Sequence, residues 1–276
     1  MMSQQITFIG GGNMANALVG GLVNQGISAG NITVTDLNIS NLDALEKTYG
    51  IKTSQDNLSA AQNADIIVLA VKPQVMETVL KPLQPVLLKN RPLIISIAAG
   101  INLHSLATWG GAADLPIVRC MPNTPSLMGL GASGLFANMA VSQAQKDSAQ
   151  NILKAVGIAL WVNSEAEIDA VTAVSGSGPA YYFLLMEAMV AAGQQLGLSE
   201  TVARQLTLQT ALGAATMASK SSDSPAELRR KVTSPNGTTE QAIKTFEAGD
   251  FAGLVNDALR AASDRSLSLS KELGVK

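Results

Sequence analysis

Short apolar runs fill the first part of the chain and then stop, and this change limits the fold more than any other feature. Up to Val162, β-branched and apolar runs alternate with stretches that favour helix. The runs are Ile6–Ile9, Ile32–Thr35, Ile66–Val71, Leu93–Ile97, Ile117–Cys120 and Ile158–Val162, and Gly131–Asn138 is a further, less regular candidate. Because these runs are apolar without alternation and helices connect them, they predict a parallel sheet buried on both faces. We therefore expect a doubly wound α/β domain.

From about Glu165 onward the β-branched runs vanish, and good helix formers replace them. Five stretches rich in Ala, Leu, Met and Gln are separated by Gly or by Ser, Asp or Thr stops. They are Pro179–Leu196, Glu200–Ser219, Pro225–Val232, Thr239–Ala248 and Gly253–Leu273. The chain is long enough for two domains. We predict an α/β domain at residues 1–164 and an all-helical domain at residues 165–276, with a short joint between them.

The composition narrows the possible partners. Hydrophobic residues make up 47% of the chain and charged residues 14%, which favours a subunit interface over a monomer with one large core. The net charge of −2 provides no basic field for nucleic acid or an anionic membrane. The most apolar helical stretch is interrupted by Glu187 and is too short to span a bilayer. A single cysteine, Cys120, fits a reducing compartment, so a cytoplasmic location is expected.

A glycine-rich turn follows the first apolar run. Residues 10–15 read Gly-Gly-Gly-Asn-Met-Ala, the G-x-G-x-x-A form of the dinucleotide fingerprint. Gly10 permits the tight turn, Gly12 lets a pyrophosphate approach the backbone, and Ala15 allows close packing of helix on strand. The motif alone is weak evidence. Its place between a first strand and a helix, in a unit that closes at Thr35, favours a cofactor site and a Rossmann-type domain over a plain turn.

Asp36 directly follows the second run, about 20 residues after the fingerprint. A carboxylate at this position can accept hydrogen bonds from the adenosine ribose and would repel a 2′-phosphate. No arginine follows in residues 37–41 to bind such a phosphate. These residues favour NADH. The alternative is that Asp36 only caps the turn Asp-Leu-Asn.

Three further loops leave the carboxyl ends of predicted strands. Ala70-Val71-Lys72-Pro73 places a lysine after a buried strand, Ser96–Gly100 supplies small residues, and Met121–Pro125 is stiffened by two prolines. Each could be an ordinary loop. Three in succession on one sheet edge favour a ligand crevice.

Groups suited to acid–base chemistry are scarce. The only histidine, His104, is better interpreted as a surface residue than as a catalytic one, and Cys120 as an inert core thiol. No residues show metal-ligand spacing, so no metal is predicted. Reduction of a carbonyl calls for a positioned acid, whereas a C=N bond that arrives protonated needs mainly orientation. The inventory favours an imine as hydride acceptor.

Two segments of the helical part carry small and polar residues at a helix start. They are Val174–Tyr181 and Val232–Glu240. Such a turn presents backbone N–H groups and hydroxyls to an anion, and a small carboxylate would fit. Either segment alone could also be an ordinary helix cap.

At these residues the chain resembles a known family. Pro225–Ile243 closely resembles the signature of the Δ1-pyrroline-5-carboxylate reductases. Further motifs recur in the family's order: Gly10–Ala15, Ala70–Pro73, Ser96–Gly100, Met121–Pro125 and Ser175–Tyr181. The resemblance implies the last step of proline biosynthesis, in which NADPH or NADH reduces L-1-pyrroline-5-carboxylate to L-proline. It also implies a homodimer with interlocking helical domains, often assembled into a decamer, and an active site between the nucleotide domain of one subunit and the helical domains of the dimer.

Individual roles follow from this resemblance together with the local patterns. The expected cofactor-binding residues are Gly10, Gly12, Asn13, Met14, Ala15, Asp36, Asn57, Ala70, Val71, Lys72, Pro73, Ala98 and Asn123. The expected substrate-binding residues are Ser177, Ser234, Gly237, Thr238 and Thr239. By resemblance, Thr239 would be the catalytic candidate, with its hydroxyl nearest the ring nitrogen. Pro179 and Tyr181 would shape the pocket wall.

Two positions depart from the family's commonest pattern. Asn236 stands where glycine is usual, and Asn tolerates unusual backbone angles. Asp36 stands where many members have Ser, Thr or Asn suited to NADPH, so the sequence leaves the choice between NADPH and NADH open.

Two rival functions fit the sequence less well. A β-hydroxyacid dehydrogenase would need a catalytic lysine on the first long helix of its second domain, but no Lys or Arg occurs between Lys154 and Arg204. A non-catalytic nucleotide sensor would not need an anion-binding turn in the helical part.

Overall fold

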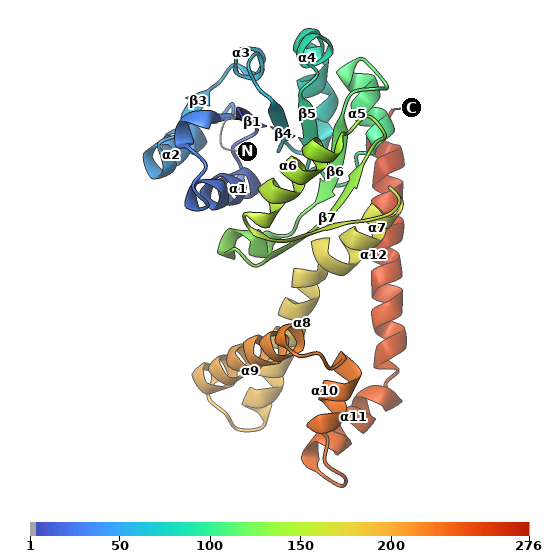
Figure 1. Cartoon of the computed structure of the whole chain (residues 1–276). Coiled ribbons are helices and arrows are strands. Elements are labelled where there is room, and N and C mark those ends of the chain that lie inside the picture. Colours follow the sequence, from blue (N-terminus) through green and yellow to red (C-terminus); the bar gives the residue numbers. More distant parts are fainter. Residues whose placement is uncertain (1–3, 276) are drawn as a thin grey trace. The chain divides into compact units, whose positions relative to one another are not determined.

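The computed structural model describes residues 4–275, which form two compact units (Figure 1). The first unit contains the described residues through Ser177 and those from Ala261 onward, and the second unit is Gly178–Arg260. The units thus divide later than the predicted boundary at residue 164. The reason is that α7 (Glu167–Val171) and the π-helical turn η4 (Thr172–Gly176) contact strands of the sheet.

Within residues 4–275, eight strands form one sheet in the order β3-β2-β1-β4-β5-β6-β7-β8. The strands are β1 (Ile6–Ile9), β2 (Ile32–Thr35), β3 (Lys52–Ser54), β4 (Ile66–Leu69), β5 (Leu93–Ser96), β6 (Ile117–Met121), β7 (Gly131–Ala137) and β8 (Gly157–Trp161). All neighbours are parallel except β6 and β7, which are antiparallel. The prediction of a parallel sheet is therefore wrong for β8, which is parallel to β7 and so runs opposite to β6. Residues 122–130, which contain only the short 3₁₀ turn η3 (Thr124–Met128), are too few for a crossover helix.

Helices cover both faces of the sheet, which confirms the doubly wound class. One face packs against α1 (Asn13–Asn24), α2 (Ile39–Tyr49) and α6 (Gln143–Lys154). The other packs against α3 (Asn57–Ala61), α4 (Met76–Asn90) and α5 (Leu103–Gly110). Adjacent β1 residues Phe8 and Ile9 are both buried, one in each layer, because successive strand residues point to opposite faces. This explains why the strands lack polar alternation.

The second unit is helical, as predicted. It contains α8 (Gly178–Gln195), α9 (Glu200–Lys220), α10 (Pro225–Lys231), α11 (Thr238–Ala248) and the first part of α12 (Phe251–Leu273). Helices α8 and α9 contact each other, yet within them only Gly178, Ala203 and Thr207 are buried. Large apolar side chains such as Phe183 and Leu212 are more than half exposed. In residues 4–275, no helix has the length and apolarity needed to span a bilayer.

Candidate functional site

A cavity of about 830 Å³ opens at the carboxyl ends of β1, β2 and β4. Its lining residues are Ile9, Gly10, Gly12, Thr35, Asp36, Leu37, Asn41, Gln55, Asp56, Asn57, Leu58, Ala70, Val71, Lys72, Val75, Thr78, Val79, Pro82 and Leu83. The chain winds from β1 outward through β2 and β3, then returns to place β4 on the other side of β1. Ligands of doubly wound sheets bind at such a switch point.

The two fingerprint glycines, Gly10 and Gly12, have different surroundings. Gly10 adopts φ +103°, and a Cβ added there would lie 2.6 Å from the Ala70 carbonyl oxygen. Its N–H donates to the Thr35 carbonyl at 2.8 Å, so this glycine is enclosed between β2 and β4. Gly12 has φ −73°, and a Cβ there would meet no protein atom within 4 Å. Gly10 therefore serves the turn, whereas Gly12 keeps the approach to α1 open.

The start of α1 is suited to an anion. Gly12 precedes the helix, and no side chain caps its first turn. The first N–H groups of a helix lack intrahelical partners and carry the positive end of the helix dipole, so a phosphate can bind there. Ala15 is buried in the core against the sheet, Met14 is half-buried, and Asn13 is exposed.

The Asp36 carboxylate is held by the loop around it. Its Oδ2 accepts a hydrogen bond from the Gly11 N–H at 2.7 Å, and its Oδ1 accepts one from the Asn38 N–H at 2.8 Å. The Asn41 amide lies 3.4 Å from Oδ2. Asp36 thus caps its own turn and also lines the cavity, so the two interpretations drawn from the sequence are compatible.

The remaining predicted cofactor residues divide into two groups. Asn57, Ala70, Val71 and Lys72 line the cavity, and Pro73 follows directly as the first residue of the 3₁₀ turn η2 (Pro73–Val75). Ala98 and Asn123 do not line it. Ala98 is buried in the core. The Asn123 side chain donates to the Ser175 carbonyl and accepts from the Ala132 N–H. Their part in cofactor binding stays a prediction.

Several cavity residues were not foreseen. Asp56 is the clearest case, because its carboxylate caps α3 by accepting from the Leu58 and Ser59 N–H groups. The sequence Asp-Asn-Leu-Ser carries an N-cap signal that could have revealed this helix. Thr78 and Pro82, on the first turns of α4, gave no such signal.

The predicted substrate turn lies between α10 and α11. Asn236 adopts φ +61°, the left-handed conformation for which Asn is suited. Gly237 precedes α11 without a side-chain cap, which places Thr238 and Thr239 in the first turn. Glu240 accepts a hydrogen bond from the Asn236 N–H at 2.9 Å. This bond, together with Lys244, lowers the pKa of the Glu240 carboxyl below its ordinary value.

The segment predicted as a small-residue turn is a π-helical turn. Ser177 donates its N–H to the Thr172 carbonyl at 2.8 Å, and η4 leads into α8, which carries Pro179 and Tyr181. A Cβ at Gly176 would lie 2.5 Å from the Met121 Cε, so glycine permits close approach to the end of β6. Such turns are frequent at functional sites. Ser177 belongs to the first unit and Ser234–Thr239 to the second, and the binding roles of these residues stay predictions.

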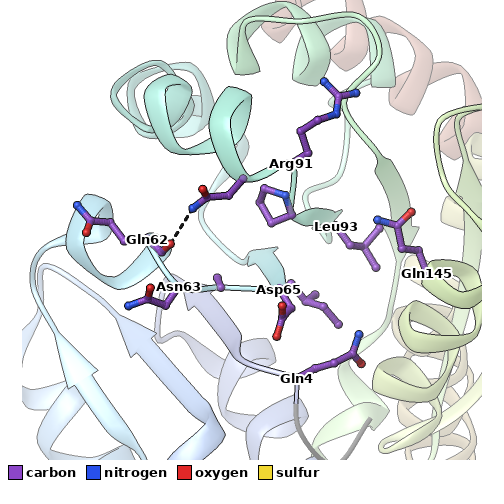
Figure 2. A pocket seen from close by; sticks show the side chains of 11 residues that line it. Gln4, Gln62, Asn63, Asp65, Arg91, Leu93 and Gln145 are labelled. Carbon is purple, nitrogen blue, oxygen red and sulfur yellow. Dashed lines mark hydrogen bonds between the residues drawn. The ribbon is translucent and has the colours of Figure 1, made fainter.

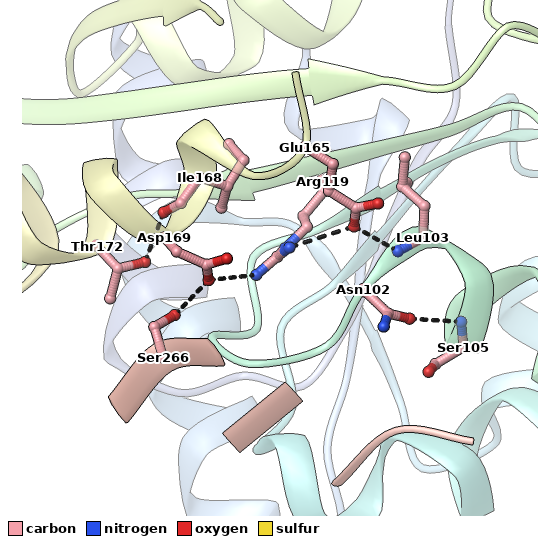
Figure 3. Close-up of polar contacts among 9 residues, drawn as sticks. All are labelled: Asn102, Leu103, Ser105, Arg119, Glu165, Ile168, Asp169, Thr172 and Ser266. Carbon is pink, nitrogen blue, oxygen red and sulfur yellow. Dashed lines mark hydrogen bonds and ion pairs between the residues drawn. The ribbon is translucent and has the colours of Figure 1, made fainter. Parts of the chain in front are cut away.

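A buried ion-pair cluster lies outside the cavity (Figure 3). Arg119 of β6 is 2% exposed, and its guanidinium contacts Glu165 at 3.2 Å and Asp169 at 3.5 Å. Glu165 also accepts from the Leu103 N–H at the start of α5, and the Ser266 hydroxyl of α12 donates to Asp169 at 2.6 Å. Through these contacts the cluster links α5, α7 and the C-terminal part of α12 to β6 of the sheet.

His104 and Cys120, which the sequence disfavoured as catalytic residues, do not line the cavity. His104 is exposed on α5. Cys120 is buried, and burial raises the pKa of its thiol well above the ordinary value, which disfavours the reactive thiolate.

A second hollow of about 460 Å³ lies at the amino ends of β4 and β5 (Figure 2). Its lining is polar and includes Gln62, Asn63, Asp65 and Arg91. None of the predicted site residues is among its lining residues, and it lies at the edge of the sheet opposite to the usual ligand position.

Comparison with known proteins gives a consistent result. Residues 165–269 match the family description "Pyrroline-5-carboxylate reductase dimerisation", and residues 5–100 match "NADP oxidoreductase coenzyme F420-dependent". The chain is 56% identical to a pyrroline-5-carboxylate reductase of Pseudomonas aeruginosa over 99% of its own length and 100% of the relative's. A relative of that name from Vibrio alginolyticus is 45% identical, covering 98% of this chain and 99% of the relative.

Solved structures agree with these relatives. A pyrroline-5-carboxylate reductase from Coxiella burnetii is 47% identical, with a TM-score of 0.93 over 99% of this chain and 100% of the other. A pyrroline carboxylate reductase from Plasmodium falciparum with NADP bound is 32% identical, with a TM-score of 0.86 over 98% and 99% of the two chains.

Proposed function

The chain belongs to the pyrroline-5-carboxylate reductase family, and on that premise we propose that it reduces L-1-pyrroline-5-carboxylate to L-proline with NADPH or NADH. The family predicted from the sequence is thereby confirmed. The observation that carries the proposal is 56% sequence identity, over 99% of the chain, to a reductase of this name. It is supported by the cavity at the switch point, whose lining includes the fingerprint residues Gly10 and Gly12.

The reaction transfers a hydride from the nicotinamide to the C=N carbon of the ring. The electron pair of the C=N π bond moves to the nitrogen, and when the imine arrives protonated the product is the neutral amine. This chain's part is to bind and orient. The uncapped start of α1 suits the pyrophosphate of the cofactor. When bound, the cofactor supplies the hydride from its nicotinamide.

The substrate carboxylate is assigned to the turn before α11. The first-turn N–H groups of this helix have no side-chain cap, and the hydroxyls of Ser234, Thr238 and Thr239 lie at the same end of the helix. Backbone donors and hydroxyls can bind a small carboxylate without an arginine. We assign the hydroxyl nearest the ring nitrogen to Thr239.

Replacing Thr239 with valine tests this assignment. If its hydroxyl binds a buried ligand group, kcat/KM should fall by the equivalent of about 1–3 kcal/mol, or roughly 5- to 150-fold. The matched control is Thr245→Val on the same helix, whose hydroxyl donates to the Gln241 carbonyl. Unchanged kinetics in Thr239→Val, measured as oxidation of reduced nucleotide, would remove the residue from the site.

Two other functions remain as alternatives to test. A β-hydroxyacid dehydrogenase would place a lysine on the first long helix of the second domain, and α8 contains none. A nucleotide sensor would bind the cofactor without turnover. Measuring NADH and NADPH oxidation with and without pyrroline-5-carboxylate separates the reductase from both alternatives, because only the reductase oxidises nucleotide in response to this imine.

The match to a dimerisation family and the exposed apolar side chains of α8 and α9 both support an oligomer. We assign a homodimer that assembles further into a decamer of five dimers. A cytoplasmic location is part of the same proposal, favoured by a chain whose single cysteine cannot form an internal disulfide.

Light scattering should give a mass about ten times the 28.6 kDa of the chain. The double substitution Leu208→Lys and Leu212→Lys places two charges on an apolar stripe of α9 and should reduce this mass to that of smaller species. Met139→Lys, at a fully exposed position of the first unit, is the control and should leave the mass unchanged. An unaltered mass in the α9 variant would exclude this stripe from the interface.

A further inference from the structure

The carboxylate of Asp36 has a fixed position beside the glycine loop. Two of its three donors are backbone N–H groups, those of Gly11 and Asn38, at 2.7 and 2.8 Å. Gly11 belongs to the fingerprint itself. The carboxylate therefore cannot swing away from the cavity without leaving two N–H groups of the loop unpaired, which carries the penalty of an unmade hydrogen bond.

The remaining acceptor capacity of Asp36 suits a hydroxyl and not a phosphate. A carboxylate offers about four lone-pair sites, and the contacts from Gly11, Asn38 and Asn41 use three of them. One site is left on Oδ1. A ribose 2′-hydroxyl can donate to it. A 2′-phosphate carries roughly −1.5 to −2 charges at neutral pH and three acceptor oxygens, so it would face the carboxylate as one anion against another.

Among the described residues, those that line the cavity on the β2 side include no compensating cation. The cavity lining contains two carboxylates, Asp36 and Asp56, and one basic residue, Lys72. Lys72 follows β4, whereas Asp36 follows β2, and β1 lies between them. With neighbouring strands about 4.8 Å apart, β2 and β4 are separated by about 10 Å. Lys72 therefore enters the cavity from the β4 side, and Asp36 from the β2 side.

The helix that follows β2 offers no substitute for a cation. The amino end of α2 could have bound a phosphate, but the Asn38 side chain caps it by accepting from the Ser40 N–H at 3.0 Å. The other polar neighbours, Asn41 and Gln55, are neutral, and Gln55 already donates to the Leu37 carbonyl.

From these contacts we propose that this chain binds NADH in preference to NADPH, and that Asp36 is the residue that determines the choice. The inference rests on the proposed function, because it concerns the cofactor of the same reaction. It departs from what the family resemblance implies, since many members have Ser, Thr or Asn at the position of Asp36. Here the carboxylate is built into the fingerprint loop through Gly11.

The test is direct binding, read from the fluorescence of the reduced nicotinamide on titration with the purified full-length enzyme. Wild type should bind NADH at least 10-fold more tightly than NADPH. Asp36→Ser should lower this preference at least 10-fold, mainly through tighter binding of NADPH. The control is Asp43→Asn, an exposed carboxylate of α2 outside the cavity lining, which should leave the preference within about twofold of wild type.

Each contrary result has a distinct meaning. Wild-type enzyme that binds NADPH as tightly as NADH, or a preference unchanged in Asp36→Ser, would overturn the role of Asp36 and leave the reductase assignment intact. If neither nucleotide binds wild type, the proposed function itself fails. An equal change in Asp43→Asn would show that net charge and not the position of Asp36 sets the preference, and would also overturn the inference.

Discussion

Replacing Gly12 with valine should abolish nucleotide binding and leave the fold intact. At this position φ is −73° and ψ −174°, an extended conformation that any residue adopts. A Cβ would meet no protein atom within 4 Å, so the added side chain would occupy only the approach to the start of α1. The dissociation constants for NADH and NADPH should rise at least about 100-fold, since each 1.4 kcal/mol of lost interaction is tenfold.

Gly10→Ala is the matched comparison and should behave differently. The left-handed φ of +103° and a Cβ 2.6 Å from the Ala70 carbonyl oxygen strain the protein itself. This variant should lose about 2–4 kcal/mol of unfolding free energy as well as binding. Gly12→Val should lose no more than about 1 kcal/mol, the scale of a changed helix cap. Nucleotide affinity within threefold of wild type in Gly12→Val would show that the cofactor lies elsewhere.

The contrast between Gly10 and Gly12 shows how much a sequence motif can predict about local backbone geometry. The fingerprint predicted both roles because its spacing reflects backbone geometry common to strand–turn–helix units. The predicted runs also located seven of the strands. The reason is clearest for β1, β2, β4, β5 and β6, since apolar β-branched residues are required wherever a strand is buried on both faces. β3 was missed because Lys52–Ser54 is short and at the sheet edge, with no side chain that is buried.

Features that depend on tertiary contacts were harder to predict. The reversal at β7 follows from the length of a connection, not from the composition of the strand. The later division between units reflects contacts of α7 with the sheet. That Asp36 binds Gly11 required knowledge of where two separate turns meet. Asp56 lines the cavity and caps α3. Its N-cap signal is local in the sequence and could have been recognised there.

Arg119 is the clearest residue missing from the predictions made from the sequence, although the sequence does contain a signal for its role. An arginine within the apolar run Ile117–Cys120 requires a buried partner. What the sequence did not reveal was which carboxylates supply it, because Glu165 and Asp169 lie more than 40 residues further along the chain. The cluster therefore had to be found in the structure.

Arg119→Met should destabilise the chain by about 3–5 kcal/mol, because it leaves buried acceptors without their cation. Asp169 is affected most, since its side chain is 6% exposed and that of Glu165 29%. The measurement is the free energy of unfolding in urea at a fixed protein concentration. Arg91→Met is the control. Arg91 pairs with Asp114 at the surface, where such a pair contributes about 0–1 kcal/mol.

A double substitution separates charge from packing. If the loss in Arg119→Met comes from the unpaired carboxylate, Arg119→Met combined with Asp169→Asn should be less unstable than the sum of the single variants by about 1–3 kcal/mol. The amide introduced by Asp169→Asn could still accept the hydrogen bond from Ser266, whose hydroxyl lies 2.6 Å from the Asp169 Oδ1, so α12 would keep its polar contact with α7. Additive losses would instead indicate that Arg119 acts through the packing of its side chain, and that the two groups are not energetically coupled.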